Sequence, residues 1–339
     1  MTLPAFGFDD APYAGGKPVV SADLKTCPED FIVEEVLGFE PDGEGEHLFL
    51  QLQTDDQNTR HTLKLLARHF GVSPKLVSYS GLKDRRGLTS QWFSLHLPGR
   101  NVEVDAAALA EQGITYLRHS RHGKKLRVGT HKANRFHIRL RNCTDIGEVE
   151  ARAATVIARG VPNYFGPQRF GHGGANVDEA LYWVESRQLP SEREKRSRVL
   201  SVLRAWLFNG ELARRIDADT WNCWLPGDPV ALSGSQSFFT PDAWDDILQR
   251  RLAEGDIHIA GRLWSPDYQG TASDAINAYL ASAGFSDATR PLRLLPREFQ
   301  LESGAGVVML SFNLPAGAYA TSVVRELVQA IDKSPAGRP

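Results

Sequence analysis

The stretch SYSGLKDRRG, residues 78 to 87, is the part of the chain best suited to chemistry. Its single carboxylate, Asp84, stands next to Lys83 on one side and to Arg85 and Arg86 on the other. Nearby positive charges favour the ionised form of a carboxyl group, so we expect Asp84 to be charged at neutral pH. Such a carboxylate could attack or stabilise an electrophilic carbon of a sugar or base. The alternative is a structural counter-ion in a surface loop, and the stretch alone does not separate the two.

The positive charges of the chain are concentrated in one segment. The formal net charge is −2 over 339 residues, yet residues 118 to 141 contain nine Lys or Arg, four His and no acid. Within that segment, RFHIRLR at 135 to 141 alternates apolar and basic residues, which predicts a strand with one buried face and one basic face. A cationic segment on an otherwise acidic chain is typical of a protein that binds a phosphate backbone. The alternative is a solvated basic face without a ligand.

Three aromatic residues could hold a splayed nucleobase. Phe31, Phe136 and Tyr319 lie in PEDF, KANRF and AGAYATS, where polar neighbours could hydrogen-bond a base edge. RNA is commonly recognised by stacking unpaired bases on aromatic rings while cations hold the backbone. The alternative for each ring is ordinary packing in the core.

Other kinds of site have little support. The three cysteines are far apart and form no CxxC pair, which favours a reducing cytosol and argues against a disulfide framework or a thiolate metal site. The clustered histidines are joined by no acid, and no nucleotide-binding glycine motif or GxSxG is present. Adjacent acids such as Glu34 and Glu35 should point to opposite faces of a strand and be exposed, so nothing selects a glycosidase pair. No segment resembles a membrane span or a secretory signal, so we expect a cytoplasmic protein.

The pattern of elements predicts two domains, because 339 residues exceed the usual span of one core. We expect strands over residues 31–37, 47–53, 90–97, 135–141 and 307–314. Helices are expected from Asn58 or Thr59 to Gly71 and over 145–160, about 192–216 and 321–333. Helices dominate the middle of the chain. The simplest architecture is an α/β domain interrupted by a mostly helical insertion.

Several blocks of the sequence resemble those of a known family. SGLKDRRGLTSQ is similar to the G-x-K-D-x-x-x-x-T-x-Q motif of the TruD family of tRNA pseudouridine synthases. KTCPEDFIVEE, GFEPDGEGEHLFL, KANRF, GVPNYFGPQRFG and LPAGAYATSVVREL also resemble blocks of that family, in the same order, from about residue 25 to 328. Ordered blocks over nearly the whole chain are more specific than any single short motif.

The resemblance implies a fold and a function. The fold would be an α/β (α+β) pseudouridine synthase core with a mostly antiparallel mixed sheet, built from residues 1–159 and 302–339. A mostly helical TRUD domain, residues 160–301, would be inserted into it. The reaction would convert uridine to pseudouridine in transfer RNA, at position 13 of the D arm for bacterial members. The family needs no cofactor and no metal. The expected partner is tRNA, with no membrane and no obligate protein partner, and the size suits a monomer.

The resemblance also assigns roles to residues. Asp84 matches the catalytic aspartate, Phe31 and Asn134 match positions that contact the target base, and Phe136 matches the aromatic beside the site. Tyr319 stands where the family pattern has Phe, so stacking should survive and the edge contact is in question. Lys25 and Lys83 match basic positions near the aspartate, and we expect Lys83 to keep Asp84 ionised. The residues expected to meet the RNA backbone are Arg85, Arg86, Lys124, Lys125, Arg127, Arg139 and Arg141.

Two questions stay open at this level. Asp84 could attack C1′ of the ribose as a nucleophile or remove the 2′ proton as a base. Two other functions also remain possible. An RNA-binding protein without chemistry would keep the basic segment and the aromatics and make Asp84 structural. A glycoside or nucleoside hydrolase would use Asp84 on a small sugar and would release free base.

Overall fold

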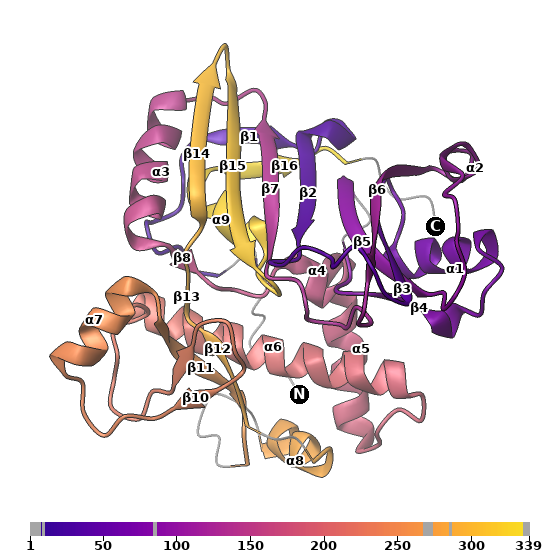
Figure 1. Cartoon of the computed structure of the whole chain (residues 1–339). Coiled ribbons are helices and arrows are strands. Elements are labelled where there is room, and N and C mark those ends of the chain that lie inside the picture. Colours follow the sequence, from indigo (N-terminus) through magenta and orange to yellow (C-terminus); the bar gives the residue numbers. More distant parts are fainter. Residues whose placement is uncertain (1–7, 9–10, 84–86, 267–273, 285–286, 335–339) are drawn as a thin grey trace. The chain divides into compact units, whose positions relative to one another are not determined.

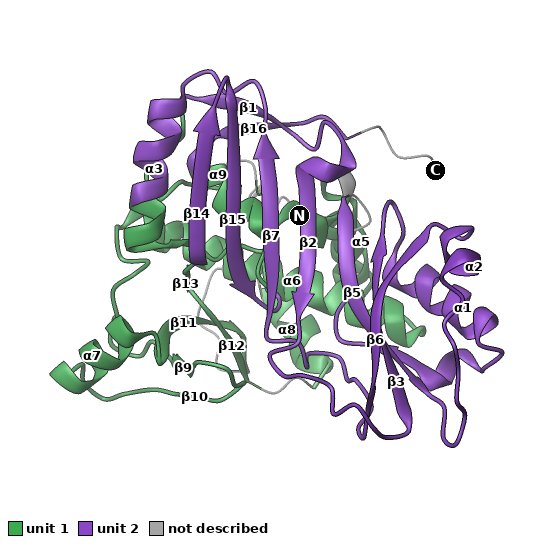
Figure 2. Ribbon diagram, turned by 45° about the horizontal axis from the view of Figure 1, so that its top comes forward, with its two compact units in different colours: residues 1–18, 155–295, 318–326 green, residues 19–154, 296–317, 327–339 purple. Residues whose placement is uncertain are grey.

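A computed structural model of the chain describes residue 8 and residues 11–83, 87–266, 274–284 and 287–334 (Figure 1). The chain divides into two compact units, coloured separately in Figure 2. Unit 1 contains residues 1–18, 155–295 and 318–326, and unit 2 contains residues 19–154, 296–317 and 327–339. The domain boundaries expected from the resemblance, at 160 and 301, stay a prediction.

Unit 2 is built on one eight-stranded sheet. Its order is β14-β15-β7-β2-β5-β3-β6, and β4 also pairs with β5. The strands are β2 (Phe31–Val36), β3 (His47–Thr54), β4 (Val77–Tyr79), β5 (Leu88–His96), β6 (Ile114–His122), β7 (Ala133–Leu140), β14 (Arg297–Gly304) and β15 (Val307–Pro315). The pair β2–β5 is parallel and the other pairs are antiparallel. The mixed, mostly antiparallel sheet that the family resemblance implies is therefore confirmed.

Local sequence explains the elements that border this sheet. In β7 the apolar side chains Phe136, Ile138 and Leu140 are buried and alternate with half-buried basic ones, as the period of two predicted. Helix α1 (Thr59–His69) begins at Asn58, whose side chain accepts a hydrogen bond from His61 N at 2.8 Å. The buried face of α1 packs in one apolar cluster with leucines of β3 and β5 and with Leu109 of α2 (Ala106–Ala110). The short turns η1 (Pro28–Asp30) and η2 (Pro74–Leu76) precede β2 and β4.

Two strands share one edge of β5. β2 pairs with residues 88–90 at the start of β5, and β4 pairs with residues 93–95 further along, while β3 occupies the other edge. The segment 80–87, which we call the 80–87 loop, leaves the sheet after β4 and returns at β5. It therefore starts and ends beside the gap between β2 and β4. The topology brings the two ends of this loop, which is predicted to carry the chemistry, to the centre of the sheet.

The predicted helix over 321–333 is only partly right. Helix α9 spans Ala320–Leu327, and the chain then forms strand β16 (Gln329–Asp332). β16 pairs in parallel with β1 (Ser21–Leu24), and the hydrogen bonds Gln329 N to Val20 O and Lys333 N to Leu24 O are both 2.8 Å. The pairing joins segments some 300 residues apart, so no local pattern could reveal it.

Unit 1 contains the helices predicted for the middle of the chain and a sheet that the sequence did not predict. The helices are α4 (Pro167–Phe170), α5 (Ala175–Ser186), α6 (Arg193–Asp217), α7 (Asp246–Glu254) and α8 (Asp274–Ser282), with the turn η3 (His172–Gly174). The sheet has the order β10-β9-β11-β12, with strands β9 (Val230–Leu232), β10 (Phe238–Phe239), β11 (Ile257–Trp264) and β12 (Ala288–Pro291). The short strands β8 (Val161–Pro162) and β13 (Arg293–Leu294) pair with each other. Helix α3 (Ile146–Arg159) crosses the boundary between the two units.

The apolar core of unit 1 is centred on α6, which contributes Leu203, Leu207 and Phe208 beside Trp221 and Trp264. Within the described parts of the chain, no helix is both long enough and apolar enough to cross a bilayer.

Candidate active site

Strand register brings the predicted base-contacting residues of unit 2 together. In the β2–β7 pair, Phe31 lies opposite Ile138, Val33 opposite Phe136, and Glu35 opposite Asn134. Side chains of directly opposed residues share one face of a sheet. We call this face the Phe31 face. The opposite side, which bears Glu34, His137 and Arg139, is called the Arg139 face.

Phe31 and Phe136 contact each other on the Phe31 face and are almost fully buried, and Phe312 of β15 stacks on Phe136 from the same face. The ring centroids of Phe31 and Phe136 lie 6.2 Å apart at an interplanar angle of 67°, an edge-to-face arrangement. The Lys25 ammonium lies 4.4 Å from the centroid of the Phe31 ring. Lys25 has a φ of +58°, a left-handed conformation that is uncommon for a non-glycine residue. The backbone at Lys25 is therefore held in a specific shape that aims its cation at this ring.

Asn134 provides an unused polar group beside these rings. Its side chain is buried, with 8% exposed, and among the described residues no group donates a hydrogen bond to its Oδ1. A buried acceptor without a donor costs about 1–3 kcal/mol, so such atoms are rare in folded proteins. The Asn134 carbonyl oxygen is therefore well placed to accept a hydrogen bond from a ligand.

A buried ion pair bridges the gap between β2 and β4. Lys83 Nζ lies 2.6 Å from Glu35 Oε2, and the two side chains are 6% and 0% exposed. Glu35 Oε1 also accepts a hydrogen bond from Trp92 N at 3.2 Å, at the point where β5 passes from β2 to β4. Burial raises the pKa of Glu35, and the Lys83 charge and these hydrogen bonds act against that rise. Glu35 therefore ties the loop residue Lys83 to two strands of the sheet.

Hydrogen bonds to α1 and β5 hold the first half of the 80–87 loop. Lys83 N donates to Thr59 Oγ1 at 3.0 Å, and Thr59 Oγ1 donates to Gln91 Oε1 at 3.0 Å. Gln91 Nε2 donates in turn to the Gly81 carbonyl. Gly87 closes the loop with a φ of +117°, and a side chain there would collide with the Phe31 carbonyl oxygen. Both ends of the loop are thus fixed against the Phe31 face.

His131 packs under the start of the same loop. Its Nδ1 lies 2.7 Å from Ser80 Oγ, and a Cβ on Gly81 would come within 2.8 Å of the imidazole. Burial, followed by the nearby Lys83 charge, lowers the pKa of His131 to about 4. The imidazole is therefore neutral at neutral pH and serves as a packing and hydrogen-bonding support for the loop.

Three predicted residues cannot be placed. Asp84, Arg85 and Arg86 lie outside the described residues, so their roles stay predictions.

The predicted backbone-binding residues of unit 2 that the structure describes lie away from the Phe31 face. Lys124, Lys125 and Arg127 are exposed on the segment 123–132, which we call the β6–β7 segment. Leu126 of this segment packs against Trp92 and Phe49, side chains of the Arg139 face, and its N donates to Ser94 Oγ at 3.1 Å. β7 directs its basic side chains to the Arg139 face as well.

Acidic partners already occupy much of the basic face of β7. Arg141 holds the buried Asp30 through two hydrogen bonds of 2.8 Å and one of 3.1 Å. Burial acts to raise the pKa of Asp30, but these Arg141 contacts and the Cys27 groups outweigh it and lower that pKa. Arg139 lies 3.9 Å from Asp30, and Arg135 lies 3.2 Å from Glu298. The predicted phosphate contacts of Arg139 and Arg141 would have to compete with Asp30.

Tyr319 belongs to unit 1. Its hydroxyl accepts a hydrogen bond from Arg169 Nε at 3.3 Å, and its ring meets Phe165 edge to face with centroids 6.2 Å apart. The Arg290 guanidinium lies 6.0 Å from the Tyr319 centroid and 4.1 Å from that of Phe165. Burial lowers the pKa of Arg290 to about 10. The hydroxyl that distinguishes this position from the family pattern is thus bound to an arginine of the same unit.

Sequence reasoning missed three residues of the site. Glu34 and Glu35 do point to opposite faces, as predicted, but Glu35 is buried and paired rather than exposed. Thr59 was noted only as a possible helix cap, and Gln91 only as the last letter of a motif. Their distance from Asp84 in the sequence gives no sign that they anchor its loop. Over the described ranges, no three His, Cys, Asp or Glu side chains converge as metal ligands.

Comparisons with known proteins agree with this architecture. The family model "tRNA pseudouridine synthase D (TruD)" matches residues 9–177. The tRNA pseudouridine synthase D of Methylococcus capsulatus is 43% identical over 341 residues, covering 95% of each chain. The tRNA pseudouridine synthases D of Aeromonas salmonicida and Pseudomonas putida are each 41% identical to this chain. The match covers 94% of this chain and of the Aeromonas salmonicida protein, and 96% of this chain and of the Pseudomonas putida protein. The crystal structure of a putative tRNA pseudouridine synthase D from Methanosarcina mazei covers 98% of this chain and 99% of its own, with a TM-score of 0.65 and 22% identity.

The solved structure shows a shared fold over nearly the whole chain. With relatives above 40% identity along almost its full length, the chain belongs to the TruD family of tRNA pseudouridine synthases, which are isomerases.

Proposed function

We propose that this chain converts uridine to pseudouridine in transfer RNA, at position 13 of the D arm, with Asp84 as the catalytic carboxylate. The proposal rests on two features together: the family motif around Asp84, and the contacts that hold the neighbouring residues of the loop against the sheet. The residues flanking Asp84 are tied to Glu35, Thr59 and Gln91 on the Phe31 face, where the acceptor of Asn134 is unused. Relatives named for this activity align over nearly the full length.

The reaction requires the base to leave its stack. The enzyme must break the bond between N1 and C1′, turn the uracil, and join C5 to C1′, which cannot happen inside a helix. Flipping the nucleotide into a pocket costs a few kcal/mol. In our proposal Asn134 Oδ1 accepts the N3–H of uracil, and Phe31 and Phe136 form the apolar wall against which the detached base turns. Asp84 then attacks C1′ or removes the 2′ proton, and both routes use its ionised form.

Charge placement suggests how the RNA backbone approaches this pocket. The β6–β7 segment carries Lys124, Lys125 and Arg127 over the Arg139 face, and among the described residues none of the three has an acidic partner within ion-pair distance. The far end of the same segment reaches the base of the 80–87 loop, where Gly129 N donates to Ser80 O at 2.6 Å. We infer that phosphates follow this segment toward the loop, and that Arg85 and Arg86 continue the path.

We propose residues 1–159 and 302–339 as the catalytic domain and residues 160–301 as the inserted domain, with Tyr319 as an aromatic contact to the substrate and Lys25 as a cation beside the site. The protein is proposed to act in the cytoplasm as a monomer with tRNA as its partner.

Two substrates test the position and the reaction class together. An unmodified tRNA transcript should gain one pseudouridine, and a transcript with cytidine at position 13 should gain none. Pseudouridine elsewhere in the second transcript would refute the assigned position. Release of free uracil would favour a hydrolase, and binding without any product would favour an RNA-binding protein without chemistry.

A further inference from the structure

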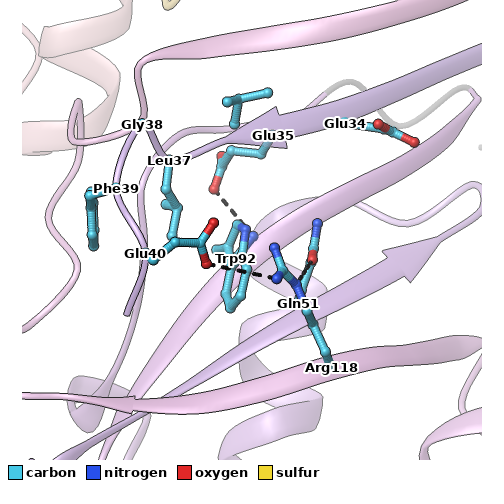
Figure 3. Close-up of a pocket in the computed structure, with 10 residues that line it drawn as sticks. Glu34, Glu35, Leu37, Gly38, Phe39, Glu40, Gln51, Trp92 and Arg118 are labelled. Carbon is cyan, nitrogen blue, oxygen red and sulfur yellow. Dashed lines mark hydrogen bonds and ion pairs between the residues drawn. The ribbon is translucent and has the colours of Figure 1, made fainter. Parts of the chain in front are cut away.

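A pocket of unit 2 is lined by Glu35 and, on the Arg139 face, by side chains that the site described above does not use (Figure 3). Its volume is about 430 Å³, within the range of small-molecule sites. Gln51 pairs in register with both Trp92 and Arg118, so these three side chains form a row across β5, β3 and β6. The turn after β2 supplies Phe39 and Glu40 on the other side.

The row forms a flat, fixed platform. The Arg118 guanidinium lies 5.0 Å from the centroid of the Trp92 ring, and its Nε donates to Gln51 Oε1 at 2.7 Å. Trp92 is only 3% exposed, whereas the Arg118 side chain is 57% exposed. The Arg118 cation therefore lies over the buried indole while much of its side chain is open to solvent. Arginine planes held in this way are surfaces on which unpaired RNA bases stack.

The edge of the platform selects for hydrogen-bond donors. Glu40 Oε2 lies 3.9 Å from Arg118 Nη1, and its side chain is 83% exposed. Figure 3 shows the Glu40 carboxylate directed toward Arg118 over the pocket. An ionised carboxylate only accepts hydrogen bonds. Guanine offers two adjacent donors on one edge, N1–H and the N2 amino group, which match the two oxygens of a carboxylate, whereas uracil offers one.

The surroundings favour a nucleotide that is part of an RNA chain. Leu126 of the β6–β7 segment packs in the same cluster as Trp92, which brings Lys124, Lys125 and Arg127 close to the pocket. Those cations can neutralise the phosphates on either side of a base held there. Glu35 of the Phe31 face also lines this pocket, but the side chains that would hold the base belong to the Arg139 face and to the turn after β2, apart from Phe31 and Phe136.

We propose that the pocket formed by Phe39, Glu40, Gln51, Trp92 and Arg118 binds an unpaired guanine of the RNA substrate, stacked on Arg118 and held at its edge by Glu40. This inference rests on the proposed function for the identity of the ligand as RNA. It adds a second base-recognition site, on the side of the sheet away from the reacting uridine.

Two nucleotides that differ in one group test the proposal. Guanosine 5′-monophosphate has the N2 amino group, and inosine 5′-monophosphate lacks it but is otherwise the same. We expect the wild-type protein to bind the guanosine nucleotide about tenfold more tightly, because hydrogen bonds to a charged group discriminate by about that factor. In Glu40→Gln this preference should disappear. Glu44→Gln, which removes an exposed carboxylate from the same turn region outside the pocket, is the matched control and should keep it.

A second variant tests the platform. Arg118→Lys keeps the charge but loses the plane, so the affinity for guanosine 5′-monophosphate should fall about tenfold, the size expected for stacking of one base. Equal affinities of the two nucleotides for the wild type, or an unchanged preference in Glu40→Gln, would overturn the proposal. Both measurements use binding alone. They can fail while tRNA is still modified, or succeed while it is not, so the proposal and the catalytic function fail separately.

Discussion

Removing the cation of the buried pair under the 80–87 loop should have a large and pH-dependent effect. Lys83→Met leaves Glu35 with a side chain that is 0% exposed and, among the described residues, only the Trp92 N–H as a partner. Breaking a buried ion pair by removing one member typically costs about 3–5 kcal/mol. Glu35 can escape part of this cost by binding a proton. The full loss is therefore expected only where the pH keeps Glu35 ionised.

The direction of the pH dependence follows from the pKa of Glu35. Burial already raises this pKa above the ordinary value of 4.5, and loss of Lys83 should raise it further. Between the unfolded and the folded pKa the folded state binds more protons, so stability falls as pH rises, by about 1.4 kcal/mol per pH unit. Lys83→Met should be close to wild type in stability near pH 5 and clearly weaker near pH 8. The double variant Lys83→Met/Glu35→Gln, which carries neither charge, should recover much of the loss at the higher pH.

The assay is urea unfolding near both pH values, with exchange of the Trp92 amide proton as the local readout of the Glu35 contact. Lys64→Met removes an exposed lysine of α1 and is the matched control. The reasoning is refuted if Lys83→Met is as stable as this control near pH 8, or if the double variant is weaker than the single one.

Three further outcomes can be checked directly. Replacing Lys124 and Lys125 by Gln should reduce the slope of log affinity for tRNA against log salt by about 1.5, and an unchanged slope would place the RNA elsewhere. Gly87→Ala should lower the rate of pseudouridine formation because the new side chain meets the Phe31 carbonyl, whereas Gly99→Ala, also at positive φ but with open space around it, should not. Asn134→Leu should abolish activity without lowering the free energy of unfolding, because it removes a buried unsatisfied acceptor; a loss of about 2 kcal/mol or more would contradict this.

Short-range patterns predicted the elements that position the site. The alternation of apolar and basic residues in β7 and the cap of α1 at Asn58 are local signals, and both are confirmed. The four-stranded sheet of unit 1 was missed because its strands are short or lie among Trp- and Pro-rich loops. The sequence around β16 predicts the end of a helix, because the strand pairs with β1 near the start of the chain and no local pattern shows that pairing.

The contacts within the site could not be predicted in the same way. The alternation in β7 separates Phe136 from Arg139, but it does not say which face the 80–87 loop covers. That depends on β2 and β4 sharing one edge of β5, and on Gly87 packing against Phe31. The burial of Glu35 likewise follows from long-range pairing. A glutamate next to another glutamate looks exposed until its cationic partner, far along the chain, is known.

The most direct test of the central claim compares the conversion of one tRNA by the wild type, by Asp84→Asn and by a control variant. Asp84→Asn keeps the size of the side chain and removes its negative charge, while Asp55→Asn alters an exposed aspartate of the same unit as a control. We predict that wild type and Asp55→Asn form pseudouridine in an unmodified transcript, and that Asp84→Asn binds the same transcript with similar affinity and forms none. Pseudouridine formation by Asp84→Asn at a rate near that of wild type would contradict the account.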